Sequence, residues 1–222
     1  PDETTVCKFR HLLERNKLGK VLLTAVNDHL RRTGIKITKG TIVDATIIGA
    51  PSSTKNKDGE RDPEMHQTAK GKQWYFGMKA HIGVDSQTKL VHTILVSAAN
   101  VHDREALPYL LHGNETRVWG DQGYQGQTAV IHAVAPNAKD FTNRRYRFNG
   151  RTNEAEKAKN RHKSRVRAKV EHVFGVIDTW NANGLFEEDE DCDQAEKNGR
   201  GAVGERQHRT ERQGERREDR GE

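Results

Sequence analysis

The sequence has little of what builds extracellular scaffolds, membrane spans or a large core. Only two of the 222 residues are cysteines, and apolar residues make up 32% of the chain, whereas about 45–50% is usual in globular proteins. Cys7 and Cys192 are far apart in sequence, which argues against a disulfide framework or a zinc site, so both are expected to be free thiols in a reducing compartment. No run approaches the ~18 apolar residues of a membrane-spanning helix, and no signal peptide is visible.

The charge of the chain is basic and unevenly placed. The formal net charge is +6 and the isoelectric point is about 9.3. Lysine and arginine are concentrated in residues 144–169. Because each phosphate that a basic side chain neutralises releases counterions, this balance favours a polyanionic partner. An ordinary basic surface on a soluble protein is the alternative interpretation.

Residues 2–33 have the apolar spacing of two helices, interrupted between Asn16 and Gly19. Residues 1–40 are therefore expected to form an N-terminal helical segment. It is either part of a DNA-binding region or a plain packing element. The chain begins with Pro1 rather than methionine, which suggests truncation at the N-terminus.

From residue 41 onward the pattern indicates an α/β domain over residues 41–186. β-branched and apolar runs predict strands, and an Ala-, Glu- and Lys-rich stretch predicts one long helix. Polar residues between the first two strands predict an exposed loop. The expected elements are a strand at 41–48, a loop at 51–72, a hairpin of strands 75–84 and 90–98, a helix at 104–111, a strand at 117–121 and a helix at 153–180. This order predicts a mixed sheet flanked by helices.

The last segment has a different composition. Residues 187–222 are rich in Glu, Arg, Gly and Gln, and Val203 is their only large aliphatic residue. A segment that buries so little apolar surface does not offset its loss of chain entropy. It is therefore expected to be a disordered, charged tail.

Three acidic residues stand in unusual contexts. Asp44 interrupts an apolar strand, Asp121 ends another, and Glu171 lies on the apolar stripe of the long helix. If the fold gathers them, their mutual repulsion predicts divalent cations between them, and hard oxygen ligands suit Mg²⁺ or Mn²⁺. Two such ions bind the attacking and leaving oxygens of a phosphoryl transfer. The structural alternatives are a hydrogen-bonded Asp44 and a salt bridge from Arg167 to Glu171.

Several longer motifs carry a family resemblance. They are Gly40–Ile48, Ala50–Ser53, Gln73–Asp85, Ala99–Asp103, Gly120–Gly126 and Ser164–Gly175. In this order they resemble the DDE transposases of bacterial insertion sequences, specifically the insertion-sequence-five group. The resemblance covers roughly residues 1–177, and its motifs are long and specific.

The resemblance implies a ribonuclease H-like fold in which Asp44, Asp121 and Glu171 are catalytic and bind Mg²⁺ or Mn²⁺. It implies a transposase that cuts DNA at the terminal inverted repeats of its element and joins the ends to target DNA. Arg167 matches the family's arginine and is expected to touch a phosphate near the cut. Contacts to double-stranded DNA are also expected from Lys79, Arg161, Lys163 and Arg165. A homodimer on DNA, in the nucleoid of a bacterial cytoplasm, completes this expectation.

The sequence departs from the family pattern near its end. Asp178 stands where the family has lysine, Ser164 where it has tyrosine, and the charged tail replaces a hydrophobic segment. These departures suggest a degenerate or frameshifted C-terminus, which reading the coding DNA past codon 177 in its other two frames would test. They leave open a catalytically inactive DNA-binding remnant or inhibitor of transposition. A nuclease that cuts without joining uses the same carboxylates and remains a third possibility.

Overall fold

The computed structural model describes residues 3–35, 39–50 and 60–182. Contacts divide the chain into two units, residues 26–177 and residues 1–25 together with 178–222. The charged tail expected at residues 187–222 lies outside the described residues. Within the described residues, no helix is both long and apolar enough to span a membrane.

The N-terminal residues form the expected pair of helices, α1 (Glu3–Arg15) and α2 (Gly19–Arg32). Lys17 has a positive φ of 53° between them, which breaks the helical path because this region is unfavourable inside a helix. Cys7, on α1, is disulfide-bonded, so the expectation of a free thiol was wrong for this residue. Separation along the sequence does not determine separation in space, and the residue's surroundings were not readable from its local pattern.

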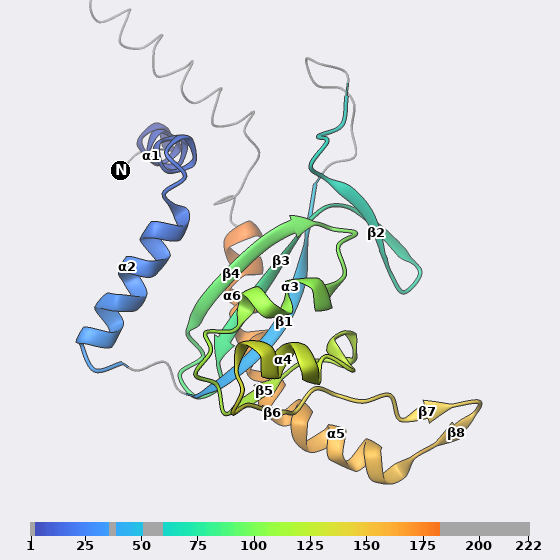
Figure 1. Ribbon diagram of the computed structural model, residues 1–222. Coiled ribbons are helices and arrows are strands. Elements are labelled where there is room, and N and C mark those ends of the chain that lie inside the picture. Colours follow the sequence, from blue (N-terminus) through green and yellow to red (C-terminus); the bar gives the residue numbers. More distant parts are fainter. Residues whose placement is uncertain (1–2, 36–38, 51–59, 183–222) are drawn as a thin grey trace, which may run out of the picture. The chain divides into compact units, whose positions relative to one another are not determined.

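The unit formed by residues 26–177 is built on a six-stranded mixed sheet (Figure 1). Its strands are β1 (Gly40–Gly49), β2 (His66–Lys70), β3 (Gln73–Asp85), β4 (Val91–Ala98), β5 (Arg117–Trp119) and β6 (Lys139–Asp140). The main path runs β2-β3-β1-β5-β6, and β4 also pairs with β3. β1 is antiparallel to β3 and parallel to β5, which is parallel to β6. This mixed sheet is consistent with the ribonuclease H-like fold expected from the sequence.

Apolar cores cover both faces of this sheet. Successive β1 residues point to opposite faces, so Val43 packs against α3 (Asp103–Leu110) and α4 (Thr128–Val134), as part of one buried cluster. Ile42 joins the other cluster with Val170 and Phe174 of α6 (Lys169–Ala182). Asp44 therefore shares its face of the sheet with Ile42. This parity directs its side chain toward the C-terminal helices.

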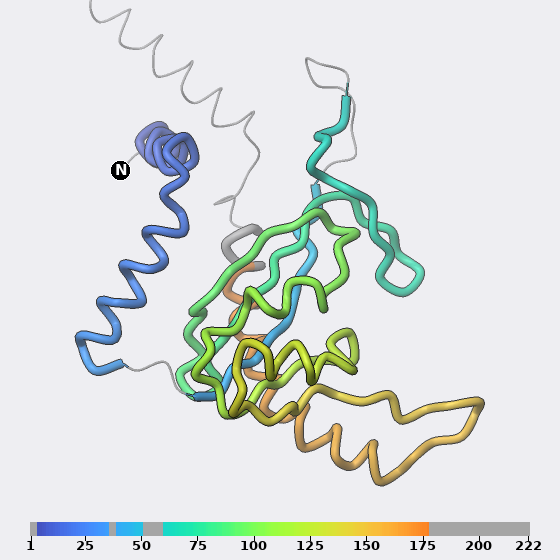
Figure 2. The backbone as a smooth tube through the Cα atoms, in the orientation of Figure 1, coloured from blue at the N-terminus to red at the C-terminus, as the bar shows by residue number. Residues whose placement is uncertain are grey.

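Three local expectations need correction. Residues 66–70, expected in a loop, form β2, because they pair with the first half of β3 in a hairpin that extends away from the other strands (Figure 2). The single long helix is two, α5 (Glu154–Arg167) and α6. They meet at Ala168, where Glu171 N donates to Ala168 O at 3.3 Å in a tighter i to i+3 turn. The short strands β6, β7 (Arg147–Phe148) and β8 (Arg151–Thr152) were not expected.

A buried polar network holds the start of β1. Glu115 has no exposed surface on its side chain and accepts hydrogen bonds from His112 N at 2.6 Å, Gly113 N at 2.8 Å and Thr41 Oγ1 at 3.2 Å. His92 Nε2 lies 3.3 Å from the same threonine hydroxyl. Burial, followed by the neighbouring His112, lowers the pKa of His92 from 6.5 to about 4. His92 is therefore neutral in the folded protein at neutral pH.

This network predicts an acid-sensitive stability. The pKa of His92 is about 4 when folded and near 6.5 when unfolded, so the unfolded chain takes up the proton first. The stability that neutral His92 contributes is fully present above pH 6.5. It decreases by on the order of 3 kcal/mol as pH falls toward 4. Urea unfolding of His92→Asn across this range should lose that slope. The matched variant His66→Asn, at an exposed position, should keep it, and an unchanged slope in His92→Asn would contradict the assignment.

The core predicts a position-dependent cost for the same substitution. Leu107 on α3 is completely buried, whereas Leu22 on α2 is 48% exposed. Leu107→Ala should lower the free energy of unfolding by about 2–5 kcal/mol, because it removes buried apolar surface and leaves a cavity. Leu22→Ala should cost less than about 1 kcal/mol. Urea unfolding monitored by tryptophan fluorescence measures both, and equal costs would show that α3 does not close this core.

Candidate active site

Asp44 is a largely buried carboxylate on β1, the strand that lies between β3 and β5 in the sheet. Its side chain is 13% exposed, and its Cα is paired with that of Ile82 on β3. Oδ1 accepts from Ala45 N at 3.0 Å, and Oδ2 accepts from Arg167 Nη1 at 2.5 Å. Burial raises the pKa of Asp44 to about 6, an effect that Arg167 opposes and Asp121 reinforces. The raised pKa means that Asp44 loses its proton less readily than an exposed aspartate, because Arg167 only partly offsets the cost of burying the charge.

Asp121 follows the adjacent parallel strand and lies near Asp44. Ile42 of β1 is in register with Trp119 of β5. Asp44 lies two residues after Ile42, and Asp121 lies two residues after Trp119. Parallel strands lie about 4.8 Å apart, so both acids lie just beyond the end of the β1–β5 pairing. For β5 this is the carboxyl end of the strand, where α/β sheets commonly bind ligands. Asp121 Oδ1 accepts from Gly123 N at 2.8 Å and caps the short 3₁₀ helix η1 (Gln122–Tyr124).

Arg167 and Glu171 come from the junction of α5 and α6. Besides its hydrogen bond to Asp44, Arg167 Nη1 lies 3.5 Å from Glu171 Oε1. The side chain of Glu171 is 61% exposed and that of Arg167 is 25% exposed. One guanidinium therefore lies between two of the three expected acids. The salt bridge that the sequence suggested is present, and it includes Asp44 as well.

The carboxylates are suited to a divalent cation but do not form a complete cage. Among residues 3–35, 39–50 and 60–182, no group of three or more His, Cys, Asp or Glu is arranged to hold a metal ion. The carboxylates of Asp44 and Asp121 nevertheless fit Mg²⁺ or Mn²⁺, because they are hard donors and the charge of Asp121 adds to the cost of ionising Asp44. Glu171 is paired with Arg167 instead of joining them.

A fourth carboxylate, Asp103, lies beside Asp121. An idealised Cβ on Gly123 would be 3.0 Å from Asp121 Oδ1 and 3.4 Å from Asp103 Oδ2, so both acids flank this glycine. Lys79 Nζ donates to Asp103 Oδ1 at 2.9 Å and to Val101 O at 2.8 Å. Asp103 is the first residue of α3, and its N-cap residue is His102. No local signal separates a capping aspartate from one whose carboxylate faces a neighbouring loop.

Tyr124 is the second residue that the sequence did not identify. Its side chain is completely buried, and its hydroxyl has no hydrogen-bond partner among the described residues. Burial raises its pKa, and Asp103, Asp44 and Asp121 raise it further. The phenol therefore stays protonated, within electrostatic reach of all three aspartates. A buried donor without an acceptor is costly, so this hydroxyl has an unused hydrogen bond to give.

The basic residues expected at DNA differ in their surroundings. Lys79 is 13% exposed and paired with Asp103, and Lys163 is 15% exposed, 3.7 Å from Glu156. Arg161 and Arg165 are exposed on α5. Lys163 Nζ also donates to Thr142 O at 2.9 Å. Exposed arginines on one helix suit phosphate contacts, while the two lysines hold neighbouring backbone in place.

Comparison with known families gives one match. Residues 36–185 match the family model described as a transposase DDE domain. This range contains Asp44, Asp121, Arg167 and Glu171 and covers more than half of the chain. No solved structure matches the chain.

The two contacts of Arg167 predict unequal coupling energies. The pair with Asp44 is short and mostly buried, whereas the pair with Glu171 is longer and exposed. A double-mutant cycle of Arg167→Met with Asp44→Asn should give about 1–3 kcal/mol. The cycle with Glu171→Gln should give less than about 1 kcal/mol. Urea unfolding at pH 7 without divalent cations measures both, and equal couplings would mean that burial does not strengthen the Asp44 contact.

Proposed function

The chain belongs to the family of transposase DDE domains, and on this basis we propose that it is a transposase of the insertion-sequence-five group. It cleaves DNA at the terminal inverted repeats of an insertion sequence and transfers the cut ends to target DNA. The observation that supports this proposal best is that Asp44 and Asp121 each lie two residues beyond the last register pair of the parallel strands β1 and β5, Ile42 and Trp119. A phosphodiester at this edge would lie beside two carboxylates and the guanidinium of Arg167.

The proposal gives each of these residues a role. Asp44, Asp121 and Glu171 would hold Mg²⁺ or Mn²⁺, with Glu171 leaving its contact to Arg167 to do so. A divalent cation supplies activation of the attacking oxygen and stabilisation of the leaving oxygen. Arg167, released from one or both carboxylates, binds a phosphate oxygen next to the cut, which its planar fork suits.

The remaining parts of the proposal concern DNA and assembly. Lys79, Arg161, Lys163 and Arg165 bind the phosphates of double-stranded DNA, the exposed arginines by direct contact and the lysines as part of the local positive field. Two copies of the chain hold the two ends of the element together. The protein acts on the nucleoid, in the cytoplasm of a bacterium.

A second candidate function is a catalytically inactive DNA-binding remnant that inhibits transposition. The observation that favours it is Arg167, whose positive charge already lies between Asp44 and Glu171. A guanidinium in this place competes with a cation for the same carboxylates. Asp178 also reverses the charge of the family's lysine. Its side chain lies outside the described part of the chain.

The test is cleavage of a labelled duplex that carries the inverted repeats flanking the coding sequence, with Mg²⁺ or Mn²⁺. We expect cleavage and strand-joined products with the unaltered chain. Asp121→Asn should reduce cleavage by about 100-fold or more, because it removes a charge that stabilises the reaction. Asp28→Asn, an exposed acid on α2, is the matched control and should cut normally.

Each other outcome selects a different function. Cleavage without joined products would identify a nuclease instead of a transposase. Binding of the repeats without cleavage, with either metal, would support the inhibitor. Equal cleavage by the Asp121→Asn and Asp28→Asn variants would place the catalytic site elsewhere.

A further inference from the structure

A pocket of about 500 Å³ adjoins the candidate active site. Its walls come from α5, η1 and the segment that follows β6, and they include Gln122, Asn143, Tyr146, Lys157, Arg161 and Ser164. Gln122 directly follows Asp121, and Asn143 N donates to Gly120 O at 2.9 Å. Ser164 lies about one turn before Arg167 on α5. The volume is within the ~300–1,000 Å³ range of pockets that hold small organic groups.

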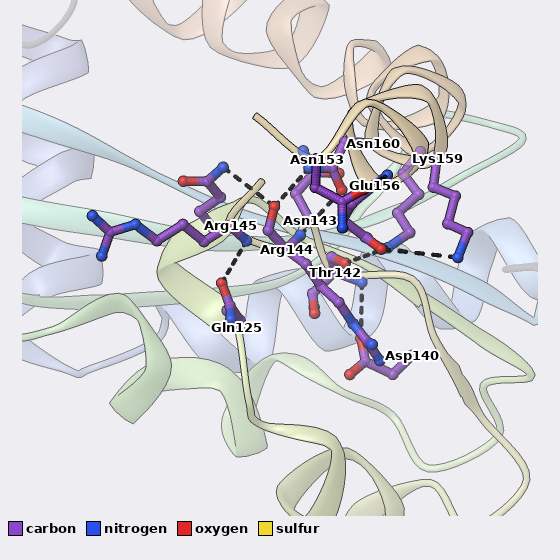
Figure 3. A network of polar contacts seen from close by, with 12 residues as sticks. Gln125, Asp140, Thr142, Asn143, Arg144, Arg145, Asn153, Glu156, Lys159 and Asn160 are labelled. Atoms are coloured by element: carbon purple, nitrogen blue, oxygen red, sulfur yellow. Dashed lines mark hydrogen bonds and ion pairs between the residues drawn. The ribbon is translucent and has the colours of Figure 1, made fainter. Parts of the chain in front are cut away.

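One wall of the pocket is held rigidly by hydrogen bonds (Figure 3). Asn160, 6% exposed, uses both ends of its amide on one residue, because Oδ1 accepts from Arg144 N at 3.1 Å and Nδ2 donates to Arg144 O at 2.6 Å. Arg145 N donates to Gln125 Oε1 at 2.8 Å. The segment from Thr142 to Arg145 is therefore fixed against α5 before any ligand arrives, which reduces the entropy lost on binding.

Asn143 places an unused acceptor in this wall. Its Nδ2 donates to Ser164 Oγ at 3.1 Å, but its Oδ1 is buried and has no donor among the described residues. A small adjustment of the amide would let a ligand supply the missing donor. An ionised phosphate diester has no hydrogen to donate, whereas the Watson–Crick edge of every unpaired DNA base has an N–H group. The amide therefore favours a base over a phosphate.

The rest of the pocket suits the phosphate and ring of the same nucleotide. Lys157 is paired with Glu154 at 3.2 Å. Arg161, the other cation that lines the pocket, forms no ion pair with a carboxylate of the described residues. Its planar guanidinium matches a phosphate. Tyr146 provides an aromatic ring, and base stacking on such rings is tolerant of sequence.

We propose that this pocket binds one unpaired nucleotide of a DNA strand. The base contacts Asn143 and Tyr146, and its phosphate contacts Arg161. The inference depends on the proposed function, since it places the nucleotide next to the phosphodiester at Asp121. An unpaired nucleotide is required because a base within a duplex exposes only its groove edges and cannot enter a concave pocket.

The experiment compares two fluorescent single-stranded probes by anisotropy, using the full chain. One is an octathymidylate and the other is an octamer of the same backbone with abasic sugars. The unaltered chain should bind the thymidylate at least about fivefold more tightly, because only that probe can stack a base. Asn143→Ala and Tyr146→Ala should bring this ratio toward one. Arg161→Ala should weaken both probes equally, since both have the phosphates.

The control is Lys159→Ala, which removes a cation 69% exposed on α5 that does not line the pocket. It should leave the ratio unchanged. The proposal is overturned by equal binding of both probes to the unaltered chain, or by a ratio that Tyr146→Ala does not lower. Thermal unfolding of each variant identifies loss of fold, and Tyr146→Leu repeats the test without the aromatic ring if Tyr146→Ala unfolds.

The outcome is separate from that of the cleavage assay. A chain that cuts the duplex but shows a ratio of one lacks the nucleotide pocket and keeps the proposed activity. A chain that prefers the thymidylate but never cuts has the pocket and loses the transposase assignment.

Discussion

The contact between Asp44 and Arg167 links the centre of the sheet to the junction of α5 and α6. A carboxylate inside an apolar strand is costly, and burial still dominates its pKa despite the guanidinium. The same contact sets the position of the helix end that presents Glu171. Because Arg167 contacts both Asp44 and Glu171, a change in the charge of one carboxylate alters the electrostatic environment of the other. The arrangement is a charge cluster in which one cation serves two anions, and this shortage of positive charge underlies the proposed affinity for a divalent metal.

The strand pairing explains why chemistry would occur at one edge. β1 is antiparallel to β3 but parallel to β5, so the chains of β1 and β5 continue in the same direction beyond the end of their pairing. Asp44 and Asp121 occupy equivalent places beyond the register pair Ile42 and Trp119. Apolar clusters on both faces hold these strands in place. The apolar packing that stabilises the two cores therefore also keeps Asp44 and Asp121 close together.

The candidate active site and the pocket share their backbone. The chain leaves β5 at Asp121 and enters the pocket wall at Gln122, while Asn143 is bonded to Gly120 just before the acid. A strand of DNA bound at Asp121 would thus have its next nucleotide at the pocket. Ser164 and Arg167, on the same helix, connect the two regions again. The two proposals describe neighbouring parts of one extended DNA-binding surface.

The sequence by itself determined the helical pair and most of the strands, because apolar periodicity is a local signal. The motifs around Asp44, Asp121 and Glu171 also marked these acids as candidates, and their catalytic role is part of the proposed function. It could not determine that Arg167 would lie between two of these acids, or that Asp103 would stand beside Asp121. Those contacts join residues far apart in the chain, and their distances depend on register, helix packing and the turn at Ala168. Strand β2 likewise exists because β3 offers it hydrogen bonds, which its own polar residues do not indicate. Tertiary structure decided these features because side-chain contacts are set by packing in three dimensions.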